Sequence, residues 1–251
     1  PLSIGYFADP GNNFDFAAGV ILSSGYISDA PGPNNSTGIT GNTTGPSDPL
    51  LNAIIPQTTN DAASLEFDFI PSADSLFFRY LFGSDEYPEF VNSSFNDVFA
   101  FFLSGPNPGG GNYINYNVAL IPGTTTPVSI NNVNNGQNSP PTGPCVNCAY
   151  YFDNLAVSNP NPAVEYDGLT TPLVAIASVV PCATYHIKLA VADAGDSILD
   201  SAVFLEAGSF VSGGQINMEN FGAFGGGYDL YEGCENYYIF TRTDTSNNAN
   251  P

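Results

Sequence analysis

The sequence predicts an all-β protein, a jelly-roll-like β-sandwich with long loops. Three observations predict this fold class. Apolar and polar residues alternate in several segments, as a half-buried strand requires, and helical periodicity is nearly absent. Stretches rich in Pro, Gly, Asn and Thr separate the segments and supply turn chemistry.

Two kinds of strand are expected. In 65–69, Leu65, Phe67 and Phe69 share one face and Glu66 and Asp68 the other, and 185–191 repeats the pattern with His186 and Lys188 facing outward. The segments 76–82 and 98–103 are apolar on both faces, which is typical of central strands of a sandwich. The intervening loops at 30–49, 104–112, 122–144 and 158–163 are long enough to be functional surfaces.

The sequence changes character near Val211, so we divide the chain there. Residues 1–212 are expected to form the sandwich, and SGG at 212–214 reads as a short flexible joint. Residues 213–251 are too few for a core of their own, and we expect the start of a second β module or a C-terminal β extension.

The charge excludes several partners. The chain carries 24 Asp and Glu against three Lys and Arg, a formal net charge of −21. It therefore cannot neutralise the phosphates of a nucleic acid or of an anionic membrane surface. No apolar run reaches the length of a membrane span, so direct membrane insertion is not expected.

The four cysteines are expected to form disulfides. The composition is typical of an exported protein, in which disulfides are common. A zinc site built on Cys145 and Cys148 would lack its other ligands. The pairing stays open among the three possibilities for Cys145, Cys148, Cys182 and Cys234.

Two groups of acids predict a calcium site. Calcium binds six to eight oxygens from carboxylates, amides, backbone carbonyls and water. One loop between apolar strands offers these donors, with Asn92 and Asn96 beside the carboxylates of Asp85, Glu86, Glu89 and Asp97. A strand end and a glycine-containing turn offer Asp193, Asp196 and Asp200. A bound cation would relieve the repulsion within such a cluster.

Other interpretations of these acids stay open. They can form a solvated acidic rim, because the spacing does not match a helix-loop-helix calcium loop. A lectin-like sandwich would use Tyr and Asn beside calcium. A glycoside hydrolase would need two carboxylates facing across a cleft. No nucleophile arrangement accompanies the acids, so we expect no enzymatic activity.

Several long motifs, in order, resemble the choice-of-anchor L domain. They are GVILSSGYISDAPGPNNSTG (19–38), DPLLNAIIP (48–56), the segment 59–106 with FGSDEYPEF, NVALIPGTTTPVSINNVNNG (117–136) and CATYHIKLAVADAGDSILDSAVFLEAGSF (182–210). Family members generally have another strand before IGYF. We therefore expect preceding residues to have been removed, or a neighbouring subunit to supply that strand.

The resemblance implies a secreted, cell-surface or extracellular protein, mainly of Bacteroidetes, exported by type IX secretion. It supplies no catalytic residues. We expect a non-enzymatic module of an adhesin or extracellular filament, stabilised by calcium. Its partners would be other copies of the chain or other surface proteins, bound through strand edges. In a polymer, residues 1–7 or 235–244 would pair with a neighbouring copy. Glycans are a further class of expected partner.

Glycosylation signals are also present. The N-x-[ST] pattern occurs at Asn34, Asn35, Asn42 and Asn92, although it is usually unused in bacteria. Three short motifs resemble the O-glycosylation signal of Bacteroidetes, with acceptors Ser75, Ser197 and Ser201.

Overall fold

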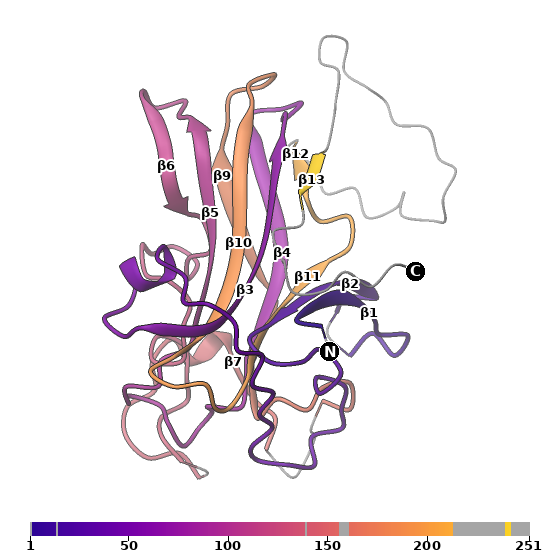
Figure 1. Ribbon diagram of the computed structural model, residues 1–251, viewed down its shortest axis with the longest axis vertical. Helices are drawn as coiled ribbons and strands as arrows, with labels where there is room; N and C mark the ends of the chain where they lie inside the picture. Colours follow the sequence, from indigo (N-terminus) through magenta and orange to yellow (C-terminus); the bar gives the residue numbers. More distant parts are fainter. Residues whose placement is uncertain (1, 14, 139, 156–160, 213–238, 242–251) are drawn as a thin grey trace.

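The protein is a sandwich of two antiparallel sheets, as predicted. The computed structural model describes residues 2–13, 15–138, 140–155, 161–212 and 239–241 (Figure 1). These residues contain no α-helix, only two short 3₁₀ turns, η1 (Leu51–Ala53) and η2 (Cys148–Tyr150). None of their helices is long and apolar enough to cross a membrane.

The larger sheet has the order β1-β2-β11-β4-β8-β7, with β9 and β12 also paired to β4. Its strands are β1 (Ile4–Ala8), β2 (Ala18–Ser23), β4 (Ser75–Ser84), β7 (Tyr151–Asp153), β8 (Gly168–Thr170), β9 (Leu173–Ser178), β11 (Ser201–Glu206) and β12 (Val211–Ser212). The second sheet has the order β13-β3-β10-β5-β6. It contains β3 (Thr59–Phe69), β5 (Val98–Pro106), β6 (Asn112–Asn117), β10 (Tyr185–Ala194) and β13 (Ile239–Thr241).

The alternating segments lie side by side. β10 pairs with β3 so that Ile187 is opposite Phe67 and Lys188 is opposite Glu66. Their apolar side chains enter the main core between the sheets, where the phenylalanine and tyrosine rings of β4 and β5 also pack. Lys188 and His186 point outward and pair with acids on β3, as the alternation predicts.

The segments that are apolar on both faces are interior strands. β5 lies between β10 and β6, and β4 has neighbours on both sides. Their outer faces are covered by loops and turns, which make two smaller cores. Leu51 of η1 packs in the cluster that contains Val98, Ala100 and Phe102 of β5. Phe16 belongs to the cluster that contains Leu81 of β4.

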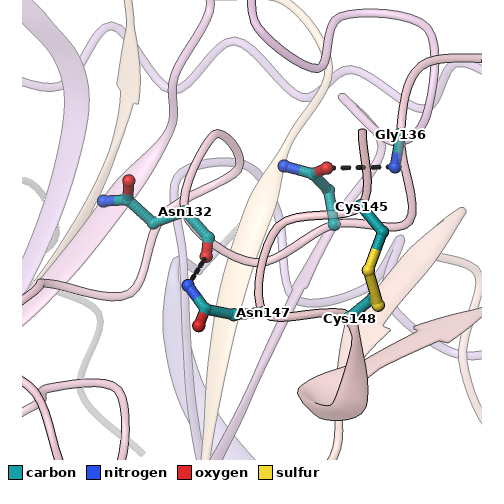
Figure 2. Close-up of a disulfide and its surroundings, with 6 residues drawn as sticks. Asn132, Gly136, Cys145, Asn147 and Cys148 are labelled. Carbon is teal, nitrogen blue, oxygen red and sulfur yellow. Dashed lines mark hydrogen bonds between the residues drawn. A yellow bond between two sulfur atoms is a disulfide. The ribbon is translucent and has the colours of Figure 1, made fainter. Parts of the chain in front are cut away.

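The cysteines among the described residues are all disulfide-bonded. Cys145 bonds to Cys148, and Figure 2 shows the bond in its loop, where the Asn147 side chain donates to the Asn132 carbonyl at 2.8 Å. Cys182 is disulfide-bonded as well. Cys234 lies outside the described residues, as does most of the predicted extension at 213–251.

Candidate functional site: a buried acid end

The loops 30–49 and 122–144 lie at one end of the sandwich, the lower end in Figure 1. The strands β3, β4, β5 and β10 all begin or end there, because each pairs antiparallel with a neighbour. We call the carboxylates at this end the acid end. They are Asp61, Asp85, Glu86, Asp97, Glu165, Asp167, Asp193 and Asp200, and each is at most 4% exposed.

Asp97 and Asp200 have well-defined hydrogen-bond partners. Asp97 accepts a hydrogen bond from the Ala194 amide at 2.8 Å and another from the Ser201 hydroxyl at 2.6 Å. Both oxygens of Asp200 accept from the Gly41 amide, at 3.0 and 2.8 Å. These bonds tie the loops before β5 and β11 to distant segments, so both carboxylates have a structural role.

Asp193 differs from Asp97 and Asp200, because its carboxylate is buried and accepts no hydrogen bond of good geometry. It is 1% exposed, and neither carboxylate oxygen has a partner of good geometry. Burial raises its pKa well above the usual value, the charge on Asp97 raises it further, and the nearby Ser24 hydroxyl lowers it. Asp61, whose Oδ2 also lacks a partner, adds to the repulsion.

Asp85 and Asp167 form a second pair of buried acids, each with one unpartnered oxygen. Asp85 Oδ1 accepts from the Asp167 amide at 3.2 Å, but Asp85 Oδ2 and Asp167 Oδ2 have no partner. Burial, followed by repulsion from Asp167, raises the pKa of Asp85 to about 9. Burial raises the pKa of Asp167 to about 7, although the Asn34 side chain donates to it.

Glu86 connects the two groups electrostatically. Its Oε2 is buried and has no partner. Burial raises its pKa, and the charges of Asp97, Asp196 and Asp85 raise it further. Carboxylates from distant segments of the chain therefore share one poorly solvated region.

The described basic residues are all engaged elsewhere. Arg79 pairs with Glu206 at 2.8 Å, and Lys188 pairs with Asp48 at 2.7 Å. His186 contacts Asp68 at 2.8 Å. Among the described residues, these ion pairs leave the acid end without a basic partner, so protons or a bound cation are the candidates to balance its charge there.

The sequence-predicted ligands are only partly brought together. Asp85, Glu86, Asp97, Asp193 and Asp200 lie at the acid end, and Asp196 is a half-buried turn residue that faces Glu86. Glu89 is exposed. Across the described ranges, no three Asp, Glu, His or Cys side chains converge in a geometry that could hold a metal ion.

Sequence reasoning missed Asp61, Glu165 and Asp167. Asp61 stands alone in the sequence, so clustering of acids gave no signal for it. Glu165 and Asp167 are only two residues apart, and this short acidic pair was the available signal for them. Glu165 Oε1 accepts from the amides of Asn35 and Ser36, which holds the 30–49 loop in place.

The candidate glycosylation residues differ in access. Asn35, Asn42 and Asn92 are exposed, and Ser75 and Ser197 are half-buried. Ser201 is fully buried and donates its hydroxyl to Asp97, so a modifying enzyme cannot reach it in the folded domain.

The family comparison agrees with this architecture. The family model of the choice-of-anchor L domain matches residues 2–211, which is most of the chain. The chain belongs to the choice-of-anchor L domain family. This domain is typical of surface-anchored proteins, and its match includes every acid-end residue. No curated protein matches the chain, and no solved structure matches it either.

Proposed function

We propose that this choice-of-anchor L domain is a non-enzymatic structural module of a secreted adhesin or extracellular filament, with calcium stabilising its acid end. The observation that carries the proposal is Asp193, a buried carboxylate without sound hydrogen bonds among other buried acids. Ionised carboxylates in such a place are costly unless a cation accompanies them.

Calcium suits the donor chemistry. Unpartnered oxygens of Asp193, Asp61 and Glu86 are hard donors, and the surrounding loops supply backbone carbonyls. Because no three carboxylates converge as they stand, binding draws at least one side chain inward, and water and carbonyl oxygens complete the shell. The cation would tie the start of β3, the end of β10 and the segment after β4 together.

A structural role also fits the burial of the acids. Asp85, Glu86, Asp97 and Asp193 are each at most 2% exposed, so a glycoside cannot reach them in this conformation. The module would use its sheet edges for other copies or other surface proteins. Ile4–Ala8 pairs with β2 of its own domain, and β1 is the last strand on that side of the larger sheet within the described ranges.

Thermal unfolding with calcium and with a chelator tests the proposal. We expect calcium to raise the Tm of the wild type by about 5 °C, because it binds only the folded state. Asp193→Asn should melt higher than the wild type in chelator, since folding no longer has to bury and protonate a carboxyl group at this position, and should lose the calcium-dependent rise.

The matched control is Asp74→Asn, which neutralises an exposed acid next to the start of β4. It should keep the full calcium-dependent rise. Coincident wild-type curves with calcium and with chelator would mean that protons alone balance the acid end, and the calcium proposal would be wrong.

A further inference from the structure

An open groove lies between the edge strands β6 and β9, near the upper end of the sandwich in Figure 1. Its volume is about 620 Å³. The Tyr113 hydroxyl donates to the Ser178 carbonyl at 3.0 Å and so links the two sheets there. β4 runs from Ser75, paired with Ser178, to Ser84 at the acid end. At ~3.3 Å per residue, the groove lies roughly 30 Å from the acid end.

A bulge in β6 places two tyrosines on the same side. In a regular strand, residues three apart point to opposite faces. Here the register shifts between Leu103 and Gly105, and Asn115 adopts a left-handed φ of 48°. The rings of Tyr113 and Tyr116 consequently stack, with centroids 5.4 Å apart and planes 30° apart. Bulges commonly redirect side chains at functional edges.

The lining of the groove is uncharged, although the chain has a net charge of −21. Its polar groups include the side-chain amides of Asn107 and Asn112 and the hydroxyl groups of the two tyrosines, and its apolar surface includes Ile176. Amides donate and accept hydrogen bonds, whereas the rings offer flat apolar faces. This combination favours a neutral ligand that has both hydroxyl groups and apolar C–H faces.

We propose that this groove binds a neutral carbohydrate chain, with one sugar ring packed on the exposed face of Tyr116. The sugar hydroxyls bond to the asparagine amides, and Ile176 contacts the neighbouring sugar. A second copy of the chain fits less well, because the bulge at Asn115 interrupts the straight edge that strand addition needs.

Affinity electrophoresis through gels containing laminarin, mannan or xyloglucan tests the proposal, with anionic alginate as the comparison polymer. At least one neutral polysaccharide should retard the wild type, and alginate should not. Tyr116→Ala should weaken the interaction roughly tenfold, because stacking and buried area are lost. Tyr116→Phe, which keeps the ring, should still bind.

Tyr6→Ala is the matched control, since Tyr6 is 70% exposed on β1, away from the groove. Its retardation should equal that of the wild type. Absence of retardation in all three neutral gels would overturn the proposal, as would unchanged binding by Tyr116→Ala. A wild-type dimer in sedimentation velocity that Ile176→Asp dissociates would assign the groove to a second copy instead.

The carbohydrate site is independent of the calcium proposal. Because the groove is roughly 30 Å from the acid end, retardation should persist in a chelator at a temperature where the domain stays folded. Failure of one proposal is thus distinguishable from failure of the other.

Discussion

At the scale of single residues, Tyr87 shows how the FGSDEYPEF motif contributes to stability. Its side chain is fully buried, and its hydroxyl donates to the Val133 carbonyl at 2.6 Å. Tyr87→Phe should lower the free energy of unfolding by about 1–2 kcal/mol, because a buried hydrogen bond is lost. Urea denaturation measures the change. Tyr26→Phe, which loses an exposed bond to the Asn42 carbonyl, should cost less than ~0.5 kcal/mol. Equal losses in the two variants would contradict this assignment.

The sequence predicts which acids belong to the acid end only where those acids lie close together along the chain. Asp85, Glu86 and Asp97 were predicted and lie at the acid end, whereas Glu89 was predicted and is exposed. The nearness of Asp167 to Asp85 could not be predicted, because the two approach each other only through pairing of β8 with the end of β4. Proximity along the chain therefore indicates where the acid end is, and strand pairing determines which residues belong to it.

At the scale of elements, the short turn η1 stabilises the outer face of β5. Leu51 is fully buried in the cluster formed with Val98, Ala100 and Phe102. Leu51→Ala should lower the free energy of unfolding by about 2–4 kcal/mol, since it leaves a cavity against the strand. Guanidinium denaturation measures the loss. Leu50→Ala, at a partly buried neighbour, should cost less than half as much. If the losses match, η1 does not act as a cover for β5.

The elements differ in how far sequence can predict them. Alternation identified β3 and the first half of β10, where buried residues alternate with residues that are mostly partly exposed, whereas the second half of β10 is buried on both faces. Apolar residues on both faces identified β4 and β5 as interior strands, but could not reveal that loops rather than a third sheet cover them. The bulge in β6 was also beyond prediction, because its cause is a pairing register with β5.

At the scale of the whole molecule, the acid end should make stability depend on pH. Burial raises the folded-state pKa of Asp85 from 3.8 to about 9 and that of Asp167 to about 7, so the folded state holds protons that the unfolded state releases. This contribution is full below the unfolded pKa and is lost as pH rises through the folded values. In chelator, Tm should therefore fall between about pH 5 and pH 9.

Calcium should flatten this dependence, because the cation replaces the protons and binds better as they leave. Differential scanning fluorimetry across the pH range measures both slopes. Asp193→Asn should show a shallower fall in chelator, since it removes one of the groups that titrate. A Tm that rises with pH in chelator would show that the acids are ionised and stabilising without metal.

The bulge in β6 also has a consequence for the outer edge of this sheet. Deleting Asn115 would remove the extra residue and leave the two tyrosines two residues apart, which is still one face of a regular strand. The deletion would therefore straighten the edge of β6 without separating the rings. A straight, uninterrupted edge strand is a template for strand addition, so the irregular backbone at Asn115 protects the domain from unwanted edge-to-edge association.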